Sequence, residues 1–114
     1  MNNISPQLQN QIAQFQQLQQ QLQAVSTQKA QMDAQVKEIE RTLEELEKAT
    51  GDVYKNVGSL LIKVDDKEAI KSELEDGKET YGIRIKSLER QENSLRDKYN
   101  EMQETLNKAI GKSQ

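Results

Sequence analysis

VYKNVGSLLIKV, residues 53–64, differs in composition from everything around it. This stretch is rich in Val, Ile, Leu and Tyr with a glycine at its middle, which is typical of a β-hairpin. The flanking sequence consists largely of Gln, Glu, Lys and regularly spaced Leu, which favour long helices. Because a lone two-stranded hairpin is barely stable in water, we expect this hairpin to need partners.

The composition allows only a thin apolar core. The chain has 114 residues, of which 33% are hydrophobic and 4% aromatic, and its mean hydropathy is -0.95. That content is enough for a seam between two paired helices but not for a thick globular core. Intrinsic disorder is the alternative for so polar a chain, but disordered chains seldom keep strict apolar periodicity. We therefore predict a single domain, residues 1–114.

Several function classes are disfavoured by what the sequence lacks. Without Cys or His, it has no thiolate nucleophile and lacks the commonest general base and metal ligand, so we predict no enzyme, catalytic residue, metal or cofactor. The net charge of -3, with bases interspersed among acids, makes nucleic acid a poor partner. No apolar run approaches the roughly 18 residues that span a bilayer, and the N-terminus does not resemble a signal peptide. We expect a soluble, cytoplasmic protein with no membrane partner.

The first helix is predicted over residues 5–50. Ser5 is a good N-cap and Pro6 suits the first helical position, where its missing N–H has no helical partner to lose. Gly51 is expected to terminate the helix. The glutamine-rich tract at 7–23 could by itself signal prion-like disorder. Since Leu, Ile and Phe recur in this region at helical spacing, and Gln is a good helix former, helix is the favoured interpretation.

The second helix is predicted over residues 66–110. Asp65 is expected to cap it, and Glu68 three residues later completes a pattern similar to a capping box. Gly77 and Gly82 lie inside the helical pattern, where each costs about 1 kcal/mol relative to Ala. We expect the helix to be weakest there, with a kink or a close neighbouring backbone.

Both helices carry a heptad repeat, which predicts a coiled coil. With Leu8 at position a, one frame holds as far as Leu46, and a second frame runs from Leu74 to Ala109. The short connection requires the helices, each about 65 Å long, to fold back antiparallel. The polar exceptions in the two seams are Gln11, Lys29, Lys78 and Glu92.

Two registers of this coiled coil fit the sequence. Pairing Leu46 with Lys71 aligns the apolar positions of the two seams and brings Lys29 and Glu92 into adjacent layers. Opposite charges placed in this way favour a particular register, although their net stabilisation is small. A shift by one heptad also keeps the two charges adjacent, so the sequence leaves both registers open.

The predicted hairpin is apolar on both faces. With the turn near residues 57–58, both strand edges are free, and free edges invite pairing with other chains. We therefore predict that strands from neighbouring subunits pair with the hairpin and close a sheet that is buried on both faces. The alternative is a hairpin that only connects the two helices, but a short glycine loop would do so without these apolar residues. The expected assembly residues are Val53, Leu60, Ile62 and Val64 on one face, with Tyr54 and Leu61 on the other.

The order of these elements resembles the prefoldin family, and specifically its β-type subunits with a single hairpin. The resemblance covers almost the whole chain and is strongest at VYKNVG (53–58), LLIKV (60–64) and ERQE (89–92). The tract QFQQLQQQLQ (14–23) is similar to archaeal β-type subunits. Gly77 and Gly82 depart from the family pattern, because better helix formers are expected at those positions.

The resemblance implies a chaperone without ATP of its own. It implies a heterohexamer of two α-type and four β-type subunits, in which the hairpins form two β-barrels and six coiled coils extend from them. Such a complex holds unfolded client proteins at the coiled-coil tips and delivers them to a group II chaperonin. The alternative is a structural coiled-coil tether or scaffold without client binding, which would need no α-type partner.

The heptad pairing places both chain termini at one end of the coiled coil, which we call the tip. Fraying of its last layers would expose apolar side chains there, as a holdase requires, and methionine adapts to varied partners. The alternative is that these residues only close the last layers of the coil. The predicted client contacts are Ile4, Leu8, Ile12, Phe15, Met102, Leu106 and Ile110.

Overall fold

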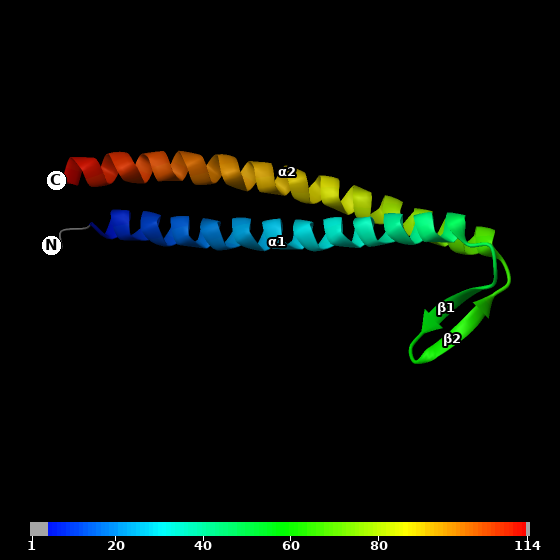
Figure 1. Ribbon diagram of the computed structural model, residues 1–114. Helices are drawn as coiled ribbons and strands as arrows, with labels where there is room; N and C mark the ends of the chain where they lie inside the picture. The colour runs from blue at the N-terminus through cyan, green and yellow to red at the C-terminus, as the bar shows by residue number, and fades with distance from the viewer. Residues whose placement is uncertain (1–4, 114) are drawn as a thin grey trace. The chain divides into compact units, whose positions relative to one another are not determined.

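The chain forms two long helices joined by one β-hairpin (Figure 1). The computed structural model describes residues 5–113, with side chains described for 5–111. The elements are α1 (Pro6–Lys48), β1 (Val53–Val57), β2 (Leu60–Val64) and α2 (Lys67–Ser113). The predicted fold class, helices dominating around a single central hairpin, is confirmed. Among the described residues no helix is long and apolar enough to cross a membrane.

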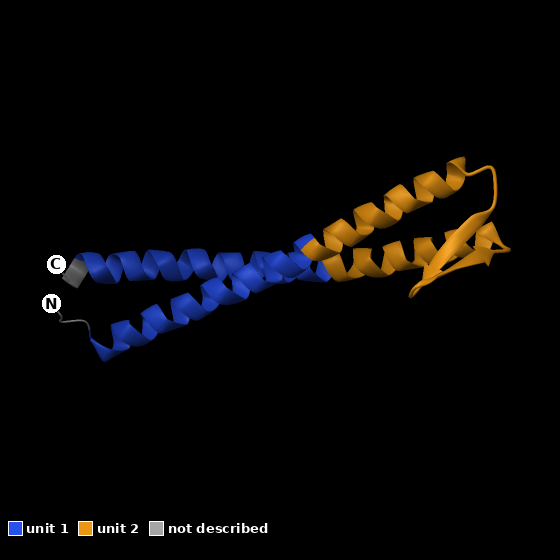
Figure 2. Cartoon of the chain, turned by 60° about the horizontal axis from the view of Figure 1, so that its bottom comes forward, with its two compact units in different colours: residues 1–30, 86–114 blue, residues 31–85 orange. Residues whose placement is uncertain are grey.

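The helices pass through two compact units, which are coloured separately in Figure 2. Unit 1 comprises Met1–Ala30 and Lys86–Gln114, and unit 2 comprises Gln31–Ile85, which includes the hairpin. Within each unit, one stretch of α1 lies beside an antiparallel stretch of α2 (Figures 1 and 2). Among residues 5–111, all the buried apolar side chains belong to unit 1 and form its core; they are Leu8, Leu18, Leu88 and Leu106.

Helix α1 begins as the sequence predicts but ends differently. The hydroxyl oxygen of Ser5 accepts a hydrogen bond from the backbone N–H of Leu8 at 3.1 Å, which is the expected N-cap. The prediction that Gly51 terminates the helix is wrong: the helix ends at Lys48, and Gly51 does not adopt a positive φ. The ammonium group of Lys67 instead donates to the carbonyl oxygen of Ala49 at 2.8 Å. A cation from the start of α2 thus satisfies a carbonyl beyond the end of α1.

Helix α2 is capped by Asp66, so the prediction that Asp65 caps it is wrong. The Oδ1 atom of Asp66 accepts from the backbone N–H groups of Glu68 and Ala69, at 3.0 and 3.2 Å. Val64 is still paired in the hairpin, so Asp65 lies in the bend that turns the chain toward the helix. The cap therefore falls one residue later, and Glu68 does not take its capping-box position.

The two glycines of α2 do not interrupt the helix. Gly77 and Gly82 both lie within the continuous helix Lys67–Ser113. A Cβ atom at Gly77 would lie 3.8 Å from the Cδ1 of Ile39, an ordinary van der Waals distance, and one at Gly82 would meet nothing within 4 Å. The expectation of a close neighbouring backbone at these positions is therefore wrong.

Cross-helix contacts select one of the two registers left open by the sequence. In unit 2 the Lys71 ammonium lies 4.0 Å from the Glu47 carboxylate, and Lys78 lies 3.8 Å from Glu40. Both pairs fit the register that sets Leu46 against Lys71. A shift by one heptad would move each partner by about 10 Å along the helix and would separate both pairs.

Candidate functional surfaces

The hairpin forms over the predicted residues, but its turn lies one residue later than the sequence predicts. Its antiparallel pairs run from Val53 opposite Val64 to Val57 opposite Leu60. The two-residue turn therefore consists of Gly58, whose φ is 60°, and Ser59, which has no positive φ. This combination fits a type II′ turn, in which glycine occupies the first central position.

Alternation along the strands places apolar side chains on both faces. Cross-strand partners share a face, so one face carries Val53, Val64, Ile62 and Leu60, and the other carries Tyr54 and Leu61, as predicted. Val57 was missed by the sequence reasoning, which placed the turn one residue too early. The Gly-Ser pair was the signal that could have identified Val57 as the last residue of its strand.

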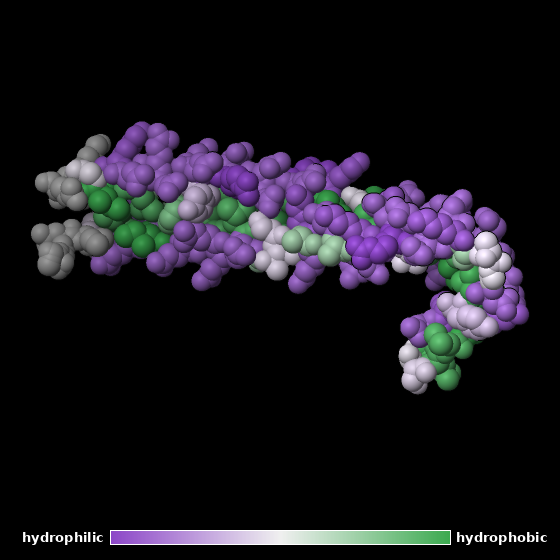
Figure 3. Space-filling view, viewed as in Figure 1, coloured by the Kyte–Doolittle hydropathy of each residue, from purple (hydrophilic) through white to green (hydrophobic). Residues whose placement is uncertain are grey.

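Most of these hairpin side chains are uncovered in the single chain. Val53 and Val64 are half-buried, but the others are exposed. Figure 3 shows hydrophobic residues gathered on the hairpin. An isolated exposed apolar residue is common on protein surfaces, whereas a contiguous apolar patch marks an interaction site. The exposed fractions are Tyr54 56%, Val57 47%, Leu60 63%, Leu61 69% and Ile62 47%.

A largely apolar groove of about 620 Å³ adjoins the hairpin within unit 2. Val53 and Tyr54 from β1 line it together with Leu46 of α1 and Leu74 of α2. The apolar surface of the hairpin is therefore continuous with the helix seam, and the candidate assembly surface extends beyond the strands themselves.

The structure distributes the predicted tip residues over different environments. Leu8 and Leu106 are buried, at 8% and 6% exposed, while Ile110 is 44% exposed. Ile12, Phe15 and Met102 are half-buried, and Ile4 lies outside the described residues. Leu8 and Leu106 thus close the seam of unit 1, and the accessible apolar surface belongs to their neighbours.

One side of the unit 1 seam is closed by an aromatic contact. The rings of Phe15 and Tyr99 stack with their centroids 4.8 Å apart and their planes at 28°. The Gln19 carboxamide lies within 3.5 Å of the Tyr99 hydroxyl, as its hydrogen-bond donor. Stacked aromatic rings contribute beyond their buried area, so this contact ties α1 to α2 in unit 1.

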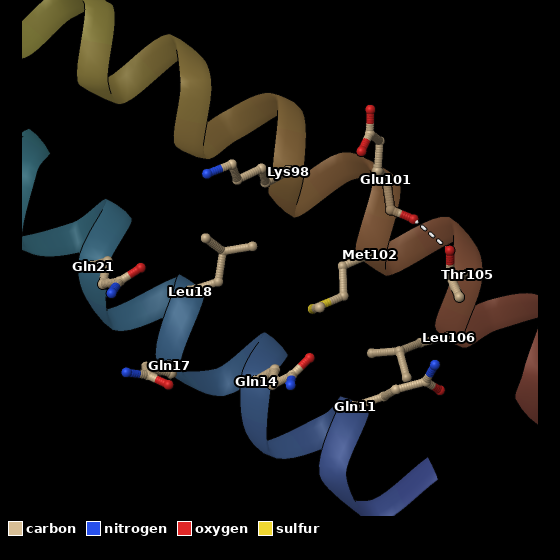
Figure 4. Close-up of a pocket in the computed structure, with 10 residues that line it drawn as sticks. All are labelled: Gln11, Gln14, Gln17, Leu18, Gln21, Lys98, Glu101, Met102, Thr105 and Leu106. Atoms are coloured by element: carbon tan, nitrogen blue, oxygen red, sulfur yellow. Dashed lines mark hydrogen bonds between the residues drawn. The ribbon is translucent and has the colours of Figure 1, made fainter. Parts of the chain in front are cut away.

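Another part of the seam is an open groove of about 450 Å³, which we call the glutamine groove (Figure 4). Leu18 from α1 and Met102 and Leu106 from α2 project into the space between the helices. Two neighbouring cavities in unit 1 share residues with it, one through Gln11 and the other through Gln21. Figure 3 shows the hydrophobic seam of unit 1 between rows of hydrophilic residues. The residues lining the glutamine groove are Gln11, Gln14, Gln17, Leu18, Gln21, Lys98, Glu101, Met102, Thr105 and Leu106.

A polar cluster interrupts the apolar seam at Glu92, whose side chain is 16% exposed. The Ser26 hydroxyl donates a hydrogen bond of 2.6 Å to the Glu92 carboxylate. The Lys29 ammonium lies 3.9 Å from Glu92 and 3.8 Å from Glu89, and Arg96 lies 3.9 Å from Glu92. The predicted proximity of Lys29 and Glu92 is therefore confirmed.

These contacts change the acidity of the Glu92 carboxyl. The hydrogen bond from Ser26 lowers the pKa of Glu92 most, and the positive charges of Lys29 and Arg96 lower it further. Partial burial acts in the opposite direction but does not cancel these effects, so the pKa remains below the ordinary glutamate value. Glu92 is thus held in its charged form between the helices.

Across the described residues, no three or more His, Cys, Asp or Glu side chains are placed to hold a metal ion. Two surfaces are candidates for binding. They are the hairpin faces in unit 2 and the glutamine groove in unit 1, which suit binding to polypeptides.

Comparisons with known proteins bear on what these surfaces do. Residues 9–113 match the family described as Prefoldin subunit. Proteins named prefoldin subunit beta are 49% identical in Methanocella arvoryzae, covering 100% of this chain and 91% of the relative, and 56% identical in Methanococcus vannielii, covering 95% and 96%. The crystal structure of the prefoldin beta subunit from Thermococcus strain KS-1 has a TM-score of 0.83, with 37% identity and 96% of each chain covered.

Proposed function

Since this chain belongs to the prefoldin subunit family, a family of chaperone subunits, we propose that it is a β-type subunit of an ATP-independent holdase. Its hairpin joins it to other subunits, and the helix ends in unit 1 capture unfolded polypeptides. The complex then delivers the captured polypeptide to a group II chaperonin, a step that we propose from family membership.

The observation that carries this proposal is the uncovered hairpin. Leu60 and Leu61 point to opposite faces and are 63% and 69% exposed. A two-stranded hairpin with both faces apolar and both edges unpaired gains stability when other strands and side chains cover it. We propose that α-type subunits and further copies of this chain do so, in a hexamer of two α-type and four β-type subunits with intersubunit β-barrels.

Client capture is assigned to the other unit. The start of α1 and the end of α2 are neighbours there, since Ser5, Leu8, Thr105 and Ala109 line one cavity. Exposed Ile110, together with half-buried apolar residues nearby, supplies apolar surface without a shaped pocket for a particular ligand. Several copies in one complex would grip one client at once, so weak individual contacts add up to high overall affinity.

A truncation separates assembly from capture. The variant lacks residues 1–10 and 105–114 and is mixed with an α-type subunit. We expect it to form a complex of the same stoichiometry by multi-angle light scattering, because the hairpin remains. Its suppression of aggregation of a chemically denatured enzyme should fall sharply. The single change Ile12→Ser should have a smaller effect, because the remaining contacts still hold the client.

The readouts distinguish the possible failures. If the truncated complex assembles and protects the enzyme as well as the intact complex, clients bind elsewhere and the assignment to unit 1 is wrong. If the intact chain forms no complex with any α-type subunit, the alternative of a structural coiled-coil tether without client binding is favoured. Circular dichroism of the truncated subunit checks that the remaining helices are folded.

A further inference from the structure

The first helix has an uncharged surface from Pro6 to Gln28. The sequence contains no Asp, Glu, Lys or Arg before Lys29 and is glutamine-rich over the same region. Helix α2 differs, because charged residues recur along its stretch in unit 1. The glutamine groove is therefore asymmetric: every residue that α1 contributes to it is neutral, and four of the five are glutamines.

The glutamines of the groove are free to bind an external partner. Elsewhere on α1, Gln19 is bonded to Tyr99 and the Gln23 carboxamide donates to Thr27. Within residues 5–111, the side chains of Gln14, Gln17 and Gln21 make no hydrogen bond to the protein, and all three are exposed.

A carboxamide offers the same chemistry as a peptide group. It carries an acceptor oxygen and a donor nitrogen with two hydrogens, so it can pair with both the N–H and the C=O of a polypeptide backbone. It does so without a charge, and hence without a preference for acidic or basic side chains. A row of carboxamides therefore suits recognition of main chain rather than of particular residues.

The apolar floor of the groove is too shallow to account for binding alone. Leu18 and Leu106 line it but are already 92% and 94% covered, since only 8% and 6% of each is exposed. Met102 is half-buried and is the apolar side chain that still has surface to offer. Because hydrophobic stabilisation scales with the area removed from water, one such side chain gives only modest affinity.

The length of the groove sets the length of its occupant. Gln11 and Gln21 are ten residues apart on one helix, a rise of about 15 Å. An extended polypeptide covers that distance with about five residues. The opposite wall carries Lys98 and Glu101, one charge of each sign, so it adds no net electrostatic preference.

We propose that the glutamine groove binds an extended, uncharged segment of about five residues from an unfolded client. The carboxamides of α1 hydrogen-bond to its backbone, and one apolar side chain rests on Met102. This inference rests on the proposed function and specifies what the capture site selects. A charged side chain laid against the neutral wall of α1 would lose hydration without gaining an ion pair on that wall, so charged segments are disfavoured.

The test compares two triple variants in the complex with an α-type subunit. The groove variant is Gln14→Glu, Gln17→Glu and Gln21→Glu. The control variant makes the same change at Gln9, Gln16 and Gln20, which are also exposed residues of the same helix but line none of the unit 1 cavities described above. Both variants gain the same charge, so a difference between them reports on the groove itself.

The probes are fluorescein-labelled peptides measured by fluorescence anisotropy. One peptide alternates Leu with Ser and Asn, and in the other two the polar positions are Glu or Lys. The unmodified complex should bind the neutral peptide most tightly, with little change between low and high salt. The groove variant should bind it about tenfold more weakly through loss of donor groups, and the control less than about twofold more weakly at physiological salt.

Other outcomes would overturn the inference. It is wrong if the two triple variants bind the neutral peptide equally, or if the unmodified complex prefers a charged peptide. If the groove variant alone changes the mass of the complex, the groove is an interface between subunits and not a client site. The truncated complex could lose protection of the denatured enzyme while the two triple variants bind the neutral peptide equally. That result would support the proposed function but refute this mode of client recognition.

Discussion

Replacing Leu60 and Ile62 by Ser should abolish assembly while leaving the subunit folded. Both side chains lie on the same face of the hairpin and are 63% and 47% exposed in the single chain. Fully burying a Leu or Ile contributes about 1.5–3 kcal/mol, so covering these exposed fractions contributes about 2–3 kcal/mol for each hairpin. Losing this contribution would weaken the association about 30- to 150-fold at every hairpin contact. In a closed barrel, several such losses act together.

The assay mixes the variant with an α-type subunit and measures mass by multi-angle light scattering over a range of concentrations. Circular dichroism should retain most of its helical signal, because the two side chains contribute little to the fold of the single chain. Ile83→Ser is the matched control: Ile83 is 66% exposed but lies on α2, outside the hairpin. A single Leu60→Ser should weaken assembly more than Ile83→Ser does. A double variant that assembles at the same concentrations as the unmodified subunit would refute the reasoning that the hairpin drives assembly.

Three further predictions concern the fold of the subunit. Ser5→Ala removes the N-cap of α1 and should lower the free energy of unfolding by about 1 kcal/mol, as measured by urea denaturation; no change would mean that another group replaces the cap. Glu92→Gln should lower the melting temperature at neutral pH, and its difference from the unmodified chain should disappear as the pH falls through the folded-state pKa of Glu92. The sign follows because the pKa of Glu92 is lower in the folded chain, so its charged form stabilises the fold at any pH above the ordinary pKa of glutamate. This stabilisation disappears as the carboxyl is protonated in acid, and a difference that persists in strong acid would contradict the prediction. Gly82→Ala should raise the free energy of unfolding by about 0.5–1 kcal/mol, because the new methyl group meets nothing within 4 Å and the helix is continuous there; a loss of stability would show that this glycine has a structural role.

The elements that the sequence predicted well are those set by local chemistry. The Ser5 cap depends on residues within one turn of helix, and the two faces of the hairpin follow from side-chain alternation along its strands. The resemblance to the prefoldin family, based on the hairpin and on ERQE at residues 89–92, is confirmed by the match over residues 9–113. Each of these signals lies in a short stretch of chain.

The predictions that failed concern the segments that connect the helices to the hairpin. Asp65 and Asp66 have the same capping chemistry, and the choice between them depends on where the hairpin ladder ends. Gly51 has the composition of a helix terminator, yet Lys67, 18 positions from Ala49, satisfies the carbonyl there. Such contacts depend on where the hairpin brings α1 and α2 together, which local sequence does not encode.

The sequence by itself determined the two long helices, the single hairpin and the apolar faces of its strands, because periodicity and turn chemistry act over a few residues. The tertiary structure decided the coiled-coil register, since heptads repeat and a shift of seven residues leaves the pattern unchanged. Only contacts across the helices, such as Lys71 with Glu47, distinguish the two registers. The tertiary structure also decided that Leu8 and Leu106 close the seam while the glutamines beside them stay exposed. Burial depends on the neighbours that the other helix supplies, and those neighbours are about 100 positions away in the sequence for these two residues.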